Sequence, residues 1–212
     1  MHYSSDDKTK NDKLYSYYLR NNANDGWSND NKEKNFAILL KLPELTNTTV
    51  AGKIILDVGS GTGDFAKLLE AFGVGRYVGV DIFEPAILLA REKYPHHTFY
   101  AADFLKKEFS DRFDFVFCSG ALTTHLHSDN YQILERVVRK MYDLCTTGIA
   151  FNFLVNKDNE EDDDLFFYDE EKVLSQIKNS LDAKKIVVEH SRVGDDYEFL
   201  QATVFVLRDS VG

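Results

Sequence analysis

The sequence predicts an α/β fold in which helices cover both faces of a mainly parallel sheet. After residue 50, mostly apolar runs of strand length alternate with segments whose apolar residues recur at helical spacing. A glycine-rich turn follows the first of these runs. Strands that are buried on both faces and separated by helices form parallel sheets with right-handed crossovers.

The first 50 residues are expected to form a helical cap on this sheet. Residues 1–13 are polar, and aromatic and apolar residues gather in the segment LYSYYLR that follows. The segment EKNFAILLKLPEL is then predicted to be a helix that Pro43 ends. We therefore expect a cap over residues 1–50 and the main domain over residues 51–212.

The main domain is predicted to contain seven strands. The first five are expected at residues 53–58, 76–81, 97–103, 113–118 and 148–155. After a helix near residues 173–181, two further strands are expected at 184–190 and 199–208 with no helix between them. Strands this close in sequence pair as a hairpin, so one of the two must run antiparallel to the others.

Composition and charge narrow the class of protein. The chain has 212 residues, which suits one domain, and a formal net charge of −10. This charge argues against binding to nucleic-acid phosphates or anionic lipid over a broad surface.

Cys118 and Cys145 each lie in an apolar stretch and are expected to be buried thiols rather than a disulfide. We expect no membrane span and no signal peptide, and hence a cytoplasmic location.

The most informative segment is ILDVGSGTGDF, residues 55–65, at a strand-to-helix turn. Its three glycines allow a tight turn and a close approach to a ligand. The free N–H groups at the start of the helix favour an anionic group. A dinucleotide loop follows G-x-G-x-x-G/A, but here the sixth position is Asp64. Asp57, two residues before the first glycine, is poorly placed beside a diphosphate and well placed to hold an ammonium group. The expected ligand therefore carries an amine and a carboxylate, as an amino acid does.

Two further acids end the next two strands. Asp81 lies 18 positions after Gly63 and can accept hydrogen bonds from both hydroxyls of a ribose. Asp103, which is followed by Phe104, can accept from an adenine amine while the aromatic ring covers the base. A single Asp at a strand end is usually a helix cap or turn former. Three acids at three successive strand ends favour a cofactor site.

An amino acid, a ribose and an adenine together describe S-adenosylmethionine, and residues 52–208 resemble the class I S-adenosylmethionine-dependent methyltransferases. The resemblance rests on D-x-G-x-G-x-G, GVDIF, AADF and the final hairpin. It implies a Rossmann-like, doubly wound seven-stranded sheet of order 3-2-1-4-5-7-6 with the seventh strand antiparallel. It also implies contacts with the methionine portion, the ribose, the adenine and the amino-acid end of the cofactor. The residues implied for these contacts are Asp57, Gly59, Ser60, Gly61, Gly63, Asp81, Ile82, Asp103, Phe104, Ser119 and Gly120.

Catalytic and substrate residues are less clearly marked. Methyl transfer from a sulfonium is an in-line displacement, so the protein mainly aligns the reactants and excludes water. A base is needed only if the acceptor must lose a proton, and His125 or His127 could serve, or could be solvated loop residues. Tyr17 and Trp27 of the cap, and Asn152 of the fifth strand, are candidate substrate contacts that could equally be packing residues. The acidic run 156–164 is read as a solvated loop, and no metal site is expected.

The leading interpretation is a methyltransferase with a small-molecule acceptor and S-adenosylmethionine as cofactor. The fourth strand ends in CSGA rather than N-P-P-Y or D-P-P-Y, and no Pro-Cys pair is present, so a nucleic-acid substrate is disfavoured. A protein substrate and a non-catalytic binding module stay open. An aminopropyl transferase is disfavoured because residues 119–124 contain no acid, and a nicotinamide oxidoreductase is disfavoured by Asp57 and Asp64.

Overall fold

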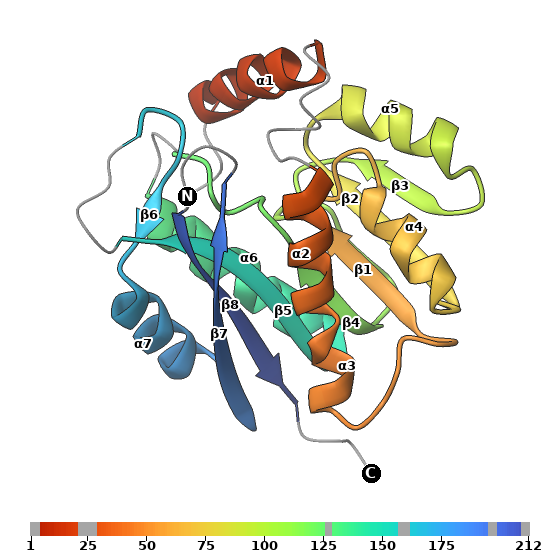
Figure 1. Cartoon of the computed structure of the whole chain (residues 1–212), viewed down its shortest axis with the longest axis vertical. Coiled ribbons are helices and arrows are strands. Elements are labelled where there is room, and N and C mark those ends of the chain that lie inside the picture. Colours follow the sequence, from red (N-terminus) through yellow and green to blue (C-terminus); the bar gives the residue numbers. More distant parts are fainter. Residues whose placement is uncertain (1–4, 21–28, 126–128, 157–161, 195–198, 209–212) are drawn as a thin grey trace.

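A single mixed sheet runs through the molecule, with helices on both of its faces (Figure 1). The computed structural model describes residues 5–20, 29–125, 129–156, 162–194 and 199–208. The strands follow the order β3-β2-β1-β4-β5-β8-β7, which is the predicted order 3-2-1-4-5-7-6. β8 is antiparallel to both β5 and β7, while the other pairs along this path are parallel. The predicted fold class and the antiparallel seventh strand are therefore confirmed.

The strands have the following bounds: β1 Ile54–Val58, β2 Arg76–Asp81, β3 Thr98–Ala101, β4 Phe113–Cys118, β5 Cys145–Val155, β6 Phe167–Tyr168, β7 Lys185–Val193 and β8 Phe199–Leu207. The helices are α1 Ser5–Arg20, α2 Asn29–Leu39, α3 Lys41–Leu45, α4 Asp64–Ala71, α5 Glu84–Lys93, α6 Asn130–Leu144 and α7 Glu170–Ser180. The two-residue β6, which pairs with the end of β5, was not predicted because so short a segment has no periodicity.

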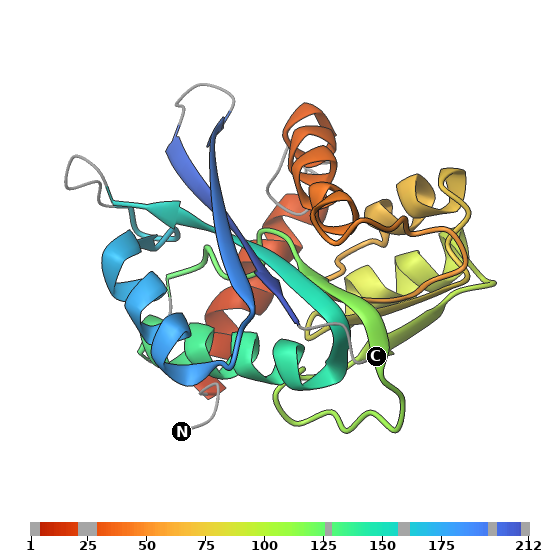
Figure 2. The same ribbon diagram turned by 90° about the horizontal axis from the view of Figure 1, so that it is seen from below.

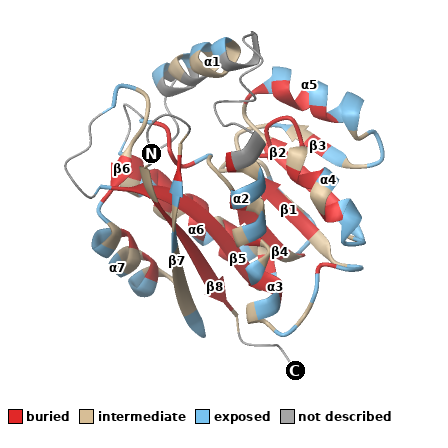
Figure 3. Ribbon diagram, viewed as in Figure 1, coloured by how far each residue is buried: buried red, intermediate tan, exposed pale blue. Residues whose placement is uncertain are grey.

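The sheet separates two hydrophobic cores. One lies under α6 and α7, and the other lies under α2, α3, α4 and α5 (Figure 2). Successive residues of β1 alternate between them, with Ile55 in the second core and Leu56 in the first. Figure 3 shows this burial along the central strands, with exposed residues on the outer faces of the helices. The doubly wound arrangement leaves the carboxyl ends of β1, β2, β3 and β4 at one edge.

The N-terminal segment is helical, as predicted, but its helices are arranged differently. Pro43 does not end a helix: α2 ends at Leu39, and Pro43 lies within the short helix α3. The prediction was wrong because proline is tolerated in the first turn of a helix, where its missing N–H has no partner to lose. Leu39 and Leu42 are completely buried in the second core, whereas α1 crosses the edge of the sheet where the parallel strands end (Figure 1). The division at residue 50 stays a prediction.

Two simpler expectations are also met. Cys118 and Cys145 are both buried free thiols. Within the described ranges, none of the helices combines the length and the apolar character that crossing a bilayer requires.

Candidate functional site

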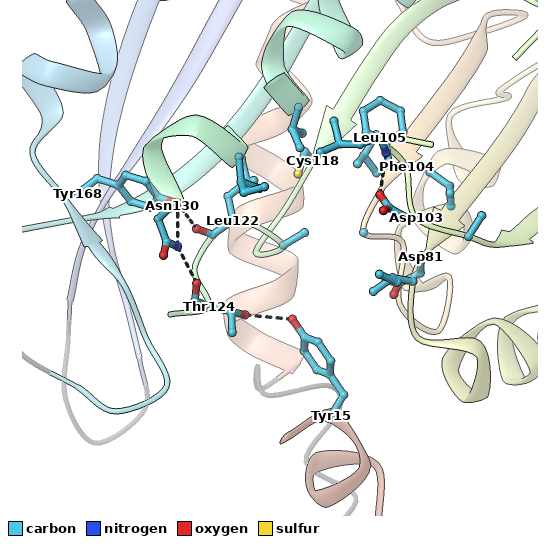
Figure 4. A pocket seen from close by; sticks show the side chains of 18 residues that line it. Tyr15, Asp81, Asp103, Phe104, Leu105, Cys118, Leu122, Thr124, Asn130 and Tyr168 are labelled. Atoms are coloured by element: carbon cyan, nitrogen blue, oxygen red, sulfur yellow. Dashed lines mark hydrogen bonds between the residues drawn. The ribbon is translucent and has the colours of Figure 1, made fainter. Parts of the chain in front are cut away.

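A cavity opens at the edge of the sheet where the parallel strands end (Figure 4). Its walls come from the ends of β1, β2, β3 and β4, from the loop after β4, and from α1 and α6. Asp81 and Asp103 lie on one side of it, Thr124, Asn130 and Tyr168 lie on the other, and Tyr15 reaches in from α1. The residues that line it are Tyr15, Val58, Gly59, Val80, Asp81, Ile82, Ala102, Asp103, Phe104, Leu105, Cys118, Ala121, Leu122, Thr124, Asn130, Ile133, Val137 and Tyr168.

The glycine turn after β1 borders this cavity and continues into a second, smaller one. The smaller cavity is lined by Lys32, Asn35, Phe36, Asp57, Gly59, Ser60, Asp64, Ser119 and Gly120. Gly59 lines both cavities. Its φ is +75°, and a Cβ atom built there would lie 2.3 Å from the Cβ of Ala121. Gly63, with φ +81°, is the N-cap of α4. Only glycine satisfies both the conformation and the space at position 59.

Asp57 is the most strongly perturbed acid of the smaller cavity. It is 4% exposed, and the hydroxyl of Tyr77 donates to its Oδ2 at 2.5 Å. Burial raises the pKa of Asp57 to about 7, the hydrogen bond from Tyr77 opposes that rise, and the charge of Asp81 adds to it. A cationic group of a ligand beside Asp57 would stabilise the charged carboxylate that burial disfavours.

Lys32 of α2 supplies positive charge to the same cavity. Its side chain is 11% exposed, and its Nζ lies 2.8 Å from Oδ2 of Asp64. Burial raises the pKa of Asp64, but the hydrogen bond and the charge of Lys32 outweigh burial and leave that pKa below its usual value. Sequence reasoning missed Lys32 and its neighbour Asn35, because nothing in the pattern of α2 marks which residue faces the glycine turn.

Ser60 brings an unpartnered hydroxyl to the wall of the smaller cavity. Its Oγ atom is buried and has no hydrogen-bond partner. Buried polar atoms in native proteins nearly always have a partner, so this hydroxyl could accept one from a ligand. The carboxyl of Asp57, the ammonium group of Lys32 and Ser60 thus line one small cavity. A zwitterionic amino-acid tail needs partners of both charges.

Asp81, the last residue of β2, and Asp103, two residues after β3, each combine the two roles considered for them. Asp81 accepts from the backbone N–H groups of Gly61 at 2.9 Å and Phe83 at 2.8 Å. Asp103 accepts from the N–H of Leu105 at 2.9 Å. Each is therefore a turn former, and each also lines the larger cavity. The backbone hydrogen bonds hold these carboxylates in place, which pre-organises them for a polar ligand.

Most of the predicted cofactor residues line one of the two cavities. In the larger one lie Gly59, Asp81, Ile82, Asp103 and Phe104, and in the smaller one lie Asp57, Gly59, Ser60, Ser119 and Gly120. Gly61 and Gly63 are not among the lining residues, and they shape the turn instead. The backbone N–H of Gly120 donates to Oδ1 of Asn152 at 2.8 Å.

The predicted substrate residues are placed differently. Tyr17 is 62% exposed and is not among the lining residues, whereas Tyr15 on the same helix is. Asn152 is buried behind the turn at Ser119 and Gly120, where it orients that turn. The sequence could not distinguish Tyr15 from Tyr17, because the polar helix α1 has no apolar stripe to show which side faces the sheet. Trp27 lies outside the described residues.

The candidate bases are not part of the cavity lining. His125 is exposed, and its ring packs edge-on against Phe166 with 5.5 Å between ring centroids. Its neighbour Thr124 does line the cavity. His127 lies outside the described residues. Among the residues that the structure describes, the geometry assigns no general base, so His125 and His127 stay predictions.

Together the sheet order and the site define the class: a Rossmann-like methyltransferase fold with a ligand site at the carboxyl ends of its parallel strands. Residues 55–148 match a family model described as a methyltransferase domain. This match and the neighbours that share the fold are consistent with the class I S-adenosylmethionine-dependent methyltransferases that the motifs resemble. S-adenosylmethionine is the cofactor of that family.

Solved structures with the same fold agree with this placement. Magnesium protoporphyrin IX methyltransferase from Synechocystis PCC 6803, with bound S-adenosylmethionine, has a TM-score of 0.68 and 16% identity over 99% of this chain and 100% of that one. The N-methyltransferase NodS from Bradyrhizobium japonicum WM9, in complex with S-adenosylhomocysteine, has a TM-score of 0.67 and 20% identity over 92% and 99%. A putative RNA methyltransferase from Pyrococcus horikoshii has a TM-score of 0.59 and 14% identity over 82% and 83%. No curated protein matches the chain.

Proposed function

We propose that this protein is an S-adenosylmethionine-dependent methyltransferase that acts on a small molecule. The observation that carries the proposal is the pair of adjoining cavities joined at Gly59. One cavity presents acids at two strand ends beside an aromatic ring, and the other presents opposite charges around an unpartnered hydroxyl.

Different lining residues would hold different parts of the cofactor. Asp57 and Lys32 would hold the amino and carboxylate groups of the methionine portion, with the hydroxyl of Ser60 as a further partner. Asp81 would accept from the ribose, and Asp103 and Phe104 would hold the adenine. When bound, S-adenosylmethionine supplies an activated methyl group, so the chain's residues need mainly to orient an acceptor and exclude water.

The helix α1 favours a small acceptor over a macromolecule. The hydroxyls of Tyr15 and Thr124 lie 3.1 Å apart across the edge of the larger cavity, and the ring of Tyr15 packs on that of Phe83. Lys10 donates to the carbonyl of Asp163 at 2.5 Å and lies 3.7 Å from the carboxylate of Asp164. α1 is thus attached to both sides of the site and covers it, which limits access to small acceptors. One structural neighbour is named as the methyltransferase of a small molecule, magnesium protoporphyrin IX.

Calorimetry with S-adenosylmethionine and S-adenosylhomocysteine tests the cofactor. We expect both to bind with dissociation constants in the micromolar range. The absence of binding heat for both ligands at several temperatures, on protein that circular dichroism shows to be folded, would refute the proposal.

A titration with RNA at several salt concentrations tests the acceptor class. The net charge of −10 predicts weak binding with little salt dependence. Tight binding with a steep salt slope would instead identify a nucleic-acid methyltransferase, with cofactor binding unaffected. The same fold serves both kinds of substrate, so only this measurement of the acceptor separates them.

A further inference from the structure

Three potential metal ligands meet at the edge of the sheet opposite the cofactor cavities. Glu70 lies in the last turn of α4, and His96 and His97 directly precede β3. Because β3 is parallel to β2 and β1, its beginning lies far along the strands from the carboxyl ends that carry Asp81 and Asp103. One nitrogen of each imidazole and one oxygen of Glu70 lie within 4.8 Å of one another.

In this cluster, one carboxylate oxygen of Glu70 contacts both imidazoles directly. Oε1 of Glu70 lies 2.5 Å from Nε2 of His96 and 3.0 Å from Nε2 of His97. The ring centroids of the two histidines are 4.4 Å apart. In a tetrahedral zinc site with bonds of about 2.0–2.1 Å, neighbouring ligand atoms are separated by about 3.3 Å. A small rotation of the solvent-facing side chains of Glu70 and His96 would open that spacing.

His97 is the most buried member of the cluster. Its side chain is only 9% exposed, and its Nε2 atom faces Oε1 of Glu70. The ring is held in this orientation by Tyr77, whose centroid lies 5.3 Å away. A neutral imidazole carries the lone pair that a metal ion requires.

We propose that Glu70, His96 and His97 bind one divalent transition-metal ion such as Zn²⁺, with water in the remaining position. Two imidazole nitrogens and one carboxylate suit Zn²⁺, Co²⁺ or Ni²⁺, whereas Ca²⁺ and Mg²⁺ prefer oxygen ligands alone. The side chain of His96 is 61% exposed, which leaves a path for the ion from solvent. The site would join the end of α4 to the loop before β3, so its role is to fix these two segments and not to take part in methyl transfer. It does not depend on the proposed function.

A cobalt titration of the full chain, metal-free and without a histidine tag, tests this site. We expect one Co²⁺ per chain with the visible absorption of a low-coordinate ion, displaced by Zn²⁺, and a rise in melting temperature with Zn²⁺. His96→Ala and Glu70→Gln should each weaken binding on the order of 100-fold or more, since even the loss of an outer partner of a metal ligand costs 10–100-fold. Both residues are exposed, so neither change should unfold the chain.

The matched control is His190→Ala. In the wild type, the imidazole of His190 pairs with Glu170 at 2.8 Å on the surface. Among the described residues this pair has no second histidine to complete a metal site, so His190→Ala should bind the ion as the wild type does. The proposal is overturned if the wild type binds no Co²⁺ or Zn²⁺. It is equally overturned if His96→Ala and Glu70→Gln bind as tightly as the wild type. In either case the cluster is a simple ion pair, whose stability responds to pH and not to metal.

Discussion

Cofactor affinity should weaken as the pH falls below 7, because Asp57 must be charged to hold an ammonium group. Burial raises the pKa of this carboxyl to about 7 in the free protein, so at lower pH the carboxyl is protonated. A bound ammonium group favours the carboxylate and lowers its pKa, which means that binding releases a proton. The α-amino group of the ligand stays charged throughout this range, because α-amino groups lose their proton only above pH 7.

The size of the effect follows from this linkage. Each pH unit below the pKa of Asp57 costs about 1.4 kcal/mol of binding free energy, a factor of ten. Because about half of the Asp57 carboxyls are already protonated at pH 7, the dissociation constant should rise about 16-fold between pH 7 and pH 5.5. S-adenosylhomocysteine is the better probe, since it carries the same amino-acid tail without the sulfonium charge. Calorimetry in buffers of different ionisation enthalpy should show release of close to one proton per ligand at pH 6.

Two variants isolate Asp57 as the origin of this dependence. Asp57→Asn should bind more weakly at pH 7.5 and lose the slope between pH 5.5 and 7. Tyr77→Phe removes the hydrogen bond that favours the carboxylate, so the midpoint should move to higher pH. A wild-type affinity that is constant over this range, or a slope that persists in Asp57→Asn, would refute the placement of the amine beside Asp57.

The raised pKa of Asp57 also makes the stability of the free protein depend on pH. The raised pKa means that the folded state holds one more proton than the unfolded state between about pH 4 and pH 7. The contribution of Asp57 to stability is therefore fully present below the unfolded pKa and is lost as the pH rises through the folded pKa of about 7. The difference of about 3 pKa units corresponds to about 4 kcal/mol. Denaturant midpoints of the wild type and of Asp57→Asn should diverge over this window.

Three further substitutions test the site and its cover. Asp81→Ala should weaken both ligands by about 1–3 kcal/mol in calorimetry, because polar partners in the cavity go unpaired, and an unchanged affinity would remove Asp81 from the site. Tyr15→Phe removes the hydrogen bond to Thr124 and should increase amide hydrogen exchange in α1, while global stability falls by no more than about 1.5 kcal/mol; protection equal to that of the wild type would show that this contact does not hold α1. Gly59→Ala places a Cβ atom where Ala121 already lies and should cost about 1–3 kcal/mol in denaturant unfolding, and a neutral result would contradict the conformation of the turn.

Local patterns were sufficient for the sheet, and most of the residues they predict for the cofactor line the two cavities. Asp57, Asp81 and Asp103 lie at or just beyond the carboxyl ends of β1, β2 and β3. Parallel strands bring these ends together, so the order of acids along the chain predicts that they cluster in space. The arrangement of the first 45 residues was harder to predict. Pro43 was read as a helix stop, yet it lies in the first turn of α3, where a proline is compatible with the helix.

The glycine turn, the order of acids and the final hairpin are enough to determine the fold and the class of cofactor, because backbone conformation and strand direction depend on neighbouring residues. The chain alone could not say that Lys32 rather than another lysine faces Asp64, that Tyr15 rather than Tyr17 enters the cavity, or that Glu70 meets His96 and His97. These pairings join segments that are distant in sequence. They depend on how helices pack on the sheet, and only the tertiary structure decides that packing.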